Sequence, residues 1–169
     1  MNVKQRAEAI GTFRFIEVRL METAAYFVPL TPEMEVKVLL GRHIWDYAQH
    51  ADWLGKRAFE LRQPEHFTRR AHDDYVQLLD SVKEARPTSE RLSLLYEVIV
   101  PGMIRRYEQY VAETDALLDA PSVAIIERIT TDLRRQIAEA TRLRVQLGTS
   151  GPPIDTVREK ERAIASVIA

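Results

Sequence analysis

Apolar residues at helical spacing dominate this sequence and limit the folds open to it. An α-helix advances about 100° per residue, so apolar residues three or four positions apart form one face that packs on a core. The first such stripe comprises Ile10, Phe13, Ile16, Leu20, Met21, Ala24 and Phe27. No alternating pattern typical of strands appears along the chain. The sequence therefore predicts an all-α fold.

Proline and glycine divide the chain into helical segments and short connections. The expected helices span about residues 3–28, 32–62, 64–85, 89–118 and 123–147. Thr31 is the expected N-cap of the second helix, and Pro101 is expected to kink the fourth and free a carbonyl near Glu97. Residues 1–148 are predicted to form one bundle and 149–169 a linker with a short helical tail. That tail can dock on the body, swap to a partner or lead into a further segment.

Charge and cysteine content narrow the possible partners. Lys and Arg total 24 against 25 Asp and Glu, so no global field favours nucleic acid or an anionic membrane. Cysteine is absent, which leaves carboxylate and imidazole as the strong metal ligands. The charged N-terminus lacks a signal-peptide core, and no apolar run approaches the roughly 18 residues of a membrane span. We therefore expect a cytoplasmic protein that binds neither nucleic acid nor a membrane.

Glu17 falls inside the apolar stripe of the first helix. Burying a carboxylate without a partner costs several kcal/mol. The side chain is therefore expected to bind a cation, to meet Arg or His, or to be protonated. A buried carboxylate of this kind is a candidate catalytic or metal-binding group, and an ordinary buried glutamate paired with Arg or Tyr is the alternative.

The segment GRHIWDYAQHADWLGKR places His43 and His50 on one shoulder of the second helix. Their seven-residue spacing is too long for both rings to bind one ion, but it suits opposite ends of one internal pocket. Asp46 lies between them and can chelate a metal or orient a histidine base. The alternative for Asp46 is a solvated, charged helix face, about 100° from Tyr47.

Further candidates lie on the later helices. Glu97 sits at the edge of the apolar stripe of the fourth helix and is a possible metal ligand, whereas the tyrosines of that helix are expected in the core. The stripe of the fifth helix contains no acid or histidine, since Glu127 and Asp132 lie off it. His66 and His72, on the crossover helix, are expected to be structural.

The order of elements, with Glu17 on the first helix, His43, Asp46 and His50 on the second, and Glu97 on the fourth, resembles the ferritin-like superfamily. The resemblance covers about residues 3–147 and implies a four-helix bundle with a crossover helix and a metal site between the helices. It implies iron or manganese as the cofactor. The second and fourth helices offer no Glu-x-x-His pair, which leaves a single metal, an atypical two-metal site or a bundle that has lost its metal.

The resemblance implies an oxidoreductase that acts on a small organic molecule inside the bundle. Glu17, His43 and His50 are then the catalytic candidates, and Glu17, His43, Asp46, His50 and Glu97 the metal ligands. The alternative is a non-catalytic helical scaffold or dimerisation protein. We also expect a homodimer, because the apolar residues of the crossover helix and tail exceed what one small bundle can cover.

Overall fold

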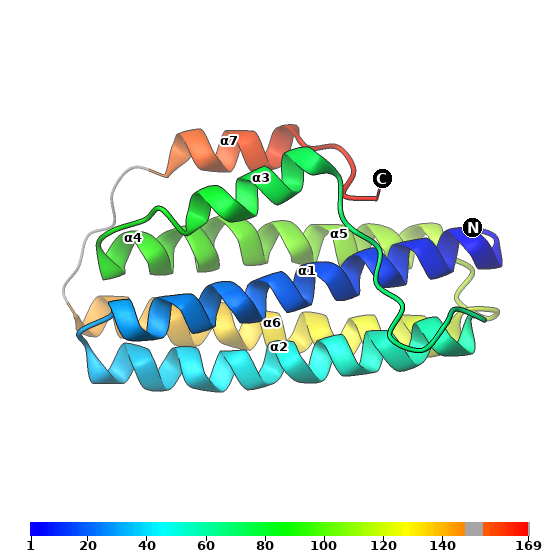
Figure 1. Cartoon of the computed structure of the whole chain (residues 1–169), viewed down its shortest axis with the longest axis horizontal. Helices are drawn as coiled ribbons and strands as arrows, with labels where there is room; N and C mark the ends of the chain where they lie inside the picture. The colour runs from blue at the N-terminus through cyan, green and yellow to red at the C-terminus, as the bar shows by residue number, and fades with distance from the viewer. Residues whose placement is uncertain (148–153, 169) are drawn as a thin grey trace.

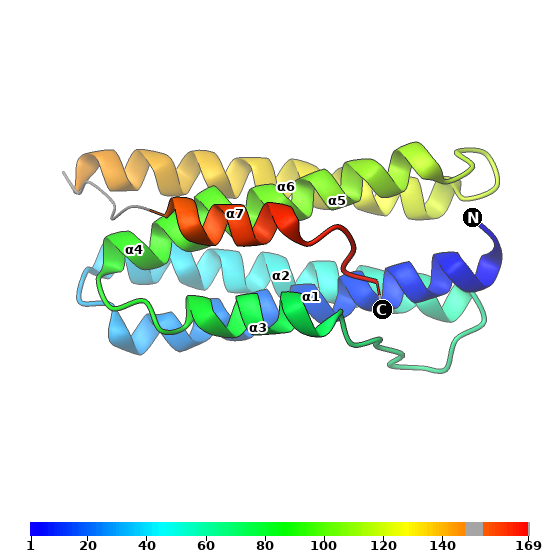
Figure 2. The same cartoon turned by 90° about the horizontal axis from the view of Figure 1, so that it is seen from above.

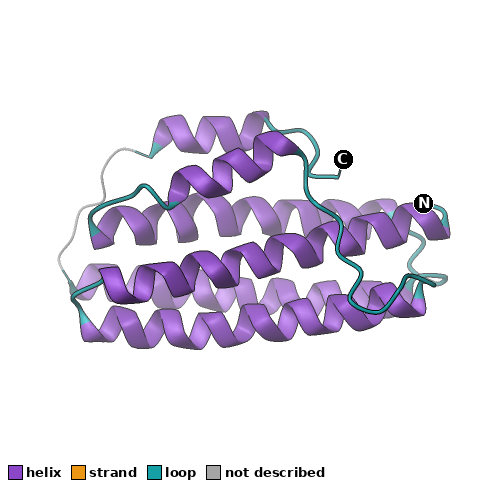
Figure 3. Cartoon of the chain, in the orientation of Figure 1, coloured by secondary structure: helices purple, strands orange, loops and turns teal. Residues whose placement is uncertain are grey.

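The computed structural model describes residues 1–147 and 154–168. All regular structure in these residues is helical, which confirms the all-α prediction (Figure 3). The long helices lie side by side, and shorter helices pack on one side of them (Figures 1 and 2). The elements in order are α1 (Val3–Leu30), α2 (Met34–Glu60), α3 (Asp73–Val82), α4 (Thr88–Ser93), the π-helical turn η1 (Leu94–Ile99), α5 (Val100–Glu113), α6 (Ala120–Gln146) and α7 (Asp155–Ala163). None of these helices is both long and apolar enough to cross a membrane.

The turn between α1 and α2 differs from the prediction at Thr31. Its hydroxyl donates to the carbonyl of Phe27 at 2.8 Å, so the side chain closes α1 instead of capping α2. Glu33 occupies the N-cap position of α2, without a side-chain capping bond. Thr31 is buried, and the hydroxyl satisfies a carbonyl that the end of α1 would otherwise leave unpaired.

The predicted crossover helix is shorter than the sequence pattern indicates. Residues 64–72 form an irregular segment, and α3 begins only at Asp73. His66 has a φ of 65°, which is incompatible with a right-handed helix. Phe67 packs directly over Gly11, where an added Cβ would overlap its ring. The tertiary contact on α1 therefore prevails over the local helical pattern of this segment.

Pro101 does disturb the fourth predicted helix. The six residues before α5 form the π-helical turn η1, which contains Glu97. Proline has no N–H to donate to the carbonyl four residues earlier, and a π turn shifts the local hydrogen-bond pattern. The helix continues as α5 and ends at Glu113, before the predicted end near residue 118.

The C-terminal helix α7 docks on the bundle against α3 and η1 (Figure 2). Glu161 is buried and pairs with Arg105 and Arg106 of α5. Gly102 leaves the space for this carboxylate, since an added Cβ would overlap it. Of the three arrangements expected for the C-terminal tail, the structure therefore contains docking on the body of the bundle. The predicted linker at 148–153 lies outside the described residues.

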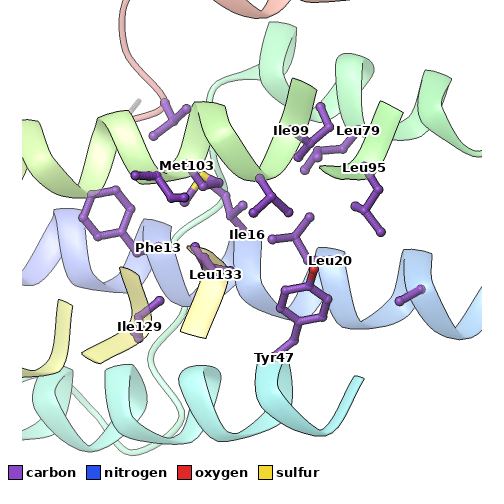
Figure 4. Packing of buried hydrophobic residues seen from close by; sticks show 14 of the residues in the cluster. Phe13, Ile16, Leu20, Tyr47, Leu79, Leu95, Ile99, Met103, Ile129 and Leu133 are labelled. Atoms are coloured by element: carbon purple, nitrogen blue, oxygen red, sulfur yellow. The ribbon is translucent and has the colours of Figure 1, made fainter. Parts of the chain in front are cut away.

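The bundle core is formed by apolar side chains from α1, α2, α6 and the continuous helix made of α4, η1 and α5 (Figure 4). Leu20 and Ile16 of α1 face Leu133 of α6 and Met103 of α5, and all four are fully buried. Leu79 of α3, a short helix packed on one side of these long helices, belongs to the same cluster. This packing fixes the rotation of α1 and, with it, the inward direction of the polar residues on its buried face.

Replacing Leu20 with alanine should lower the free energy of unfolding by about 2 to 5 kcal/mol, because a cavity remains in the close-packed core. Val3→Ala, at a position that is 52% exposed, is the matched control and should change it by less than about 0.5 kcal/mol. Equilibrium denaturation in urea measures both. Equal losses for the two variants would contradict the observed helix rotation.

Candidate functional site

Glu17 lies inside the bundle, as its position in the apolar stripe predicts. Its side chain is fully buried. One carboxylate oxygen, Oε1, accepts a hydrogen bond from the Tyr107 hydroxyl at 2.5 Å. The other, Oε2, lies 3.0 Å from Nδ1 of His50. Of the three alternatives expected for this carboxylate, the structure contains the histidine partner.

His50 lies between two carboxylates. Its Nδ1 faces Glu17, and its Nε2 lies 3.4 Å from Oδ2 of Asp132 on α6. A neutral imidazole has one N–H, so only the protonated ring can donate to two ionised carboxylates. Burial opposes protonation, but Glu17 and Asp132 outweigh it and raise the pKa of His50. The geometry therefore favours an imidazolium that neutralises Glu17.

His43 is also fully buried but has a different environment. Its Nδ1 lies 2.6 Å from the Tyr96 hydroxyl, and its Nε2 lies 3.2 Å from Oε2 of Glu139. A neutral ring satisfies both contacts if Nε2–H donates to Glu139 and Nδ1 accepts from Tyr96. Burial lowers the pKa of His43, and the nearby Glu139 opposes that shift only in part. The geometry therefore favours a neutral imidazole.

The two histidines follow one repeating pattern between α2 and α6. His43 faces Glu139 and His50 faces Asp132, and seven residues separate the members on each helix. This is the register of two antiparallel helices in contact over two turns. The histidines thus meet separate partners, whereas the sequence predicts that they line one internal pocket.

Asp46 points across to α6 between the two histidine pairs. Its Oδ2 accepts hydrogen bonds from Arg135 at 2.8 Å and from Gln136 at 3.0 Å, and its side chain is only 18% exposed. The solvated face that the charge pattern suggests is instead a contact between helices.

Glu97, the remaining candidate ligand, is one-third exposed and pairs with arginines. Arg144 of α6 contacts Oε1, and Arg158 of α7 lies 3.8 Å from Oε2. These contacts tie the π turn to α6 and α7. The structure therefore gives Glu97 a role in helix docking and does not join it to the Glu17–His50 pair.

The five predicted ligands do not form a metal site in this arrangement. Within residues 1–147 and 154–168, no group of three or more His, Asp or Glu side chains is placed to hold a metal ion. A histidine ligand needs a free ring nitrogen. Both nitrogens of His43 and of His50 face protein oxygen atoms. The residues present therefore do not fit the metal that the ferritin-like resemblance implies.

Sequence reasoning missed the partners that complete this site: Asp132, Glu139, Arg135, Tyr96 and Tyr107. The sequence predicts the tyrosines only as core residues, and it places Asp132 off the apolar stripe of its helix. A usable signal was the seven-residue spacing of Asp132 and Glu139, which equals that of the histidines. Matching spacings on two helices indicate that their shoulder residues can pair.

A second buried polar cluster lies near the C-terminal end of α2. Asp119 is fully buried and accepts hydrogen bonds from Arg57 at 3.0 Å, Tyr110 at 2.6 Å and Ser122 at 2.6 Å. Burial opposes its ionisation, but these donors lower the pKa of Asp119. The cluster fastens the connection between α5 and α6 to α2, and every member has a structural partner.

No protein-family model, curated protein or solved structure matches this chain.

The two histidines should titrate on opposite sides of the usual value of about 6.5. In an NMR titration we expect a pKa above that value for His50 and below it for His43. The contribution of His50 to stability is full below about pH 6.5 and is lost as the pH rises through its folded pKa. His43 acts in the opposite sense and lowers stability as the pH falls below about 6.5.

Substitution to glutamine assigns the two resonances. If His43 and His50 titrated together near the usual value of about 6.5, the two proposed protonation states would be wrong.

Proposed function

We propose that this chain is a ferritin-like helical bundle that acts as a non-catalytic scaffold and associates as a homodimer. The observation that carries the proposal is the engagement of both ring nitrogens of His43 and His50 by protein groups. A base or ligand needs a nitrogen lone pair that can reach substrate or metal. Neither histidine offers one in this arrangement.

The same contacts support a structural role for the polar interior. Each histidine joins α2 to α6 and also to a third helix, through Glu17 of α1 or Tyr96 of η1. Slipping α2 along α6 would separate the histidines from Asp132 and Glu139 and leave buried polar atoms unpaired, at about 1 to 3 kcal/mol each. We propose that these pairs fix the helix register, a role for which buried polar groups are known.

The outer face of α2 supports self-association. Met34, Val38 and Trp45 are 65%, 54% and 65% exposed, and their spacing places them on one side of the helix. Gly41 lies on the same side, with open space where a side chain would project. The crossover helix and tail do not provide the expected exposed surface, because their large apolar residues are packed on the bundle. The exposed apolar surface that favours a dimer therefore lies on α2 and not on these segments.

Charges along this face suit a second copy of the chain. Glu35, Arg42, Asp52 and Lys56 alternate in sign along exposed positions of α2. In an antiparallel pair of α2 helices, the negative positions of one helix face the positive positions of the other. A two-fold interface brings the same patch together from both subunits, so such a self-complementary pattern favours a homodimer.

The dimer prediction can be tested with Trp45→Glu. A charge at the centre of the proposed interface should convert a dimer into a monomer, because the carboxylate would lose its hydration on association. Light scattering over a range of concentrations measures the mass. Leu117→Glu is the matched control, since Leu117 is 86% exposed in the α5–α6 connection and should leave the dimer intact. A wild-type protein that stays monomeric at all concentrations would contradict the proposal.

A second candidate function is the metal-dependent oxidoreductase that the ferritin-like resemblance implies. The observation in its favour is the fully buried Glu17–His50 pair beside Tyr107, since clustered buried ionisable groups occur often at functional sites. Iron or manganese would be its cofactor and a small organic molecule its substrate. It requires the Glu17–His50 contact to open, because the ring nitrogen and the carboxylate oxygen now face each other.

Metal analysis separates the two candidates. Protein purified without a histidine tag and loaded anaerobically with iron or manganese should retain only trace metal after gel filtration. Stoichiometric metal that is lost on Glu17→Gln and on His50→Gln would favour the oxidoreductase. Lys56→Gln, on the exposed end of α2, is the control and should not alter the metal content.

A further inference from the structure

The outer side of α2 carries a heptad pattern over the length of the helix. Positions that are alternately four and three residues apart lie on one side of it, and each is exposed or half-buried. This spacing is typical of a helix that packs along a second helix. All but one of the residues are apolar or glycine, and together they form the α2 seam: Met34, Val38, Gly41, Trp45, Ala48, Asp52, Gly55 and Phe59.

Residue size varies along the α2 seam in a way that suits an antiparallel copy of the same helix. If Trp45 of one copy lies opposite Ala48 of the other, the two-fold axis passes between these positions. Val38 of each copy then lies opposite Gly55 of the other. Each large side chain meets a small one, as close packing between two helices requires.

A hollow of about 540 Å³ lies at the C-terminal end of the α2 seam, where Gly55, Phe59 and Arg14 of α1 are among the residues that line it. In the same antiparallel register, Met34 of the second copy lies opposite Phe59. Both side chains are largely exposed in the single chain, at 65% and 62%. Methionine is flexible and fills irregular gaps, so it suits this hollow.

Charged residues beside the α2 seam favour this register over its neighbours. It brings Glu35 of one copy to Lys56 of the other, and Arg42 to Asp52 and the neutral Gln49. A shift of one heptad in one direction would bring the two Arg42 side chains together. A shift in the other direction would bring Arg42 to Lys56. Like charges at such flanking positions oppose association, so the charge pattern selects one register.

We infer that two copies of α2 pack antiparallel with their two-fold axis between Trp45 and Ala48, and that Met34 of each copy enters the hollow beside Gly55 and Phe59 of the other. The inference rests on the proposed homodimer and specifies which residues meet in it. The Trp45 rings lie at the centre of the interface, where water is most completely excluded.

Disulfide trapping tests the register, because the chain has no cysteine of its own. Met34→Cys and Phe59→Cys chains are mixed in urea, refolded together and oxidised by oxygen with a copper phenanthroline catalyst. A disulfide-linked dimer should form in the mixture and be visible on a non-reducing gel. Each variant alone should form little, because the two copies of one position lie about 37 Å apart along the helix pair.

Leu117→Cys replaces Phe59→Cys in the control mixture, since Leu117 is 86% exposed in the α5–α6 connection and should not link to Met34→Cys. Light scattering before oxidation establishes whether each sample is dimeric. A dimer that gives no disulfide in the Met34→Cys and Phe59→Cys mixture, or one in which Met34→Cys links to itself, would overturn the register and leave the homodimer standing. A monomeric wild-type chain would overturn both.

A charge exchange tests the same register without altering the α2 seam. Glu35→Lys and Lys56→Glu should each raise the dissociation constant of the dimer at least about five-fold, because each places like charges together at two symmetric contacts. The double variant should restore the wild-type value. A double variant that associates as weakly as the single variants would contradict the inferred pairing.

Discussion

The Glu17 carboxylate is buried in the centre of the bundle and needs polar partners there, and much of the polar structure supplies or supports those partners. An ionised carboxylate without a partner in this position would cost more than most core contacts contribute. Tyr107 and His50 supply the partners, and the protonated ring of His50 then needs Asp132 on its other side. One buried charge therefore links α1, α5, α2 and α6 through a chain of paired groups.

A second histidine–carboxylate pair, His43 with Glu139, joins α2 and α6 one heptad away from His50 and Asp132. Its geometry favours a neutral ring, in contrast to His50. Burial lowers the pKa of His43. The Tyr96 hydroxyl on its inner side can also donate to a neutral ring, whereas the inner partner of His50 is a carboxylate, which only accepts. Arg135 then neutralises the acids on the outer side of both. The positive charges that face these carboxylates thus belong to the protein itself.

The sequence predicts the part of this arrangement that depends on helix phase. The apolar stripe of the first helix places Glu17 inside, and the shoulder of the second places both histidines there. It does not predict Asp132 or Glu139, because they lie off the stripe of their own helix and gain their role only from the register with α2. The irregular segment at 64–72 was missed for a similar reason, since the contact of Phe67 with Gly11 joins residues far apart in the chain.

The most direct test of the central claim is a double-mutant cycle between Glu17→Gln and His50→Gln, measured by urea denaturation near neutral pH. If the two side chains form a buried ion pair that holds the bundle together, their coupling free energy should be about 1.5 to 3 kcal/mol in favour of the native pair. Double substitution should then cost less than the sum of the single changes. Additive effects, with no coupling between the two positions, would contradict the account.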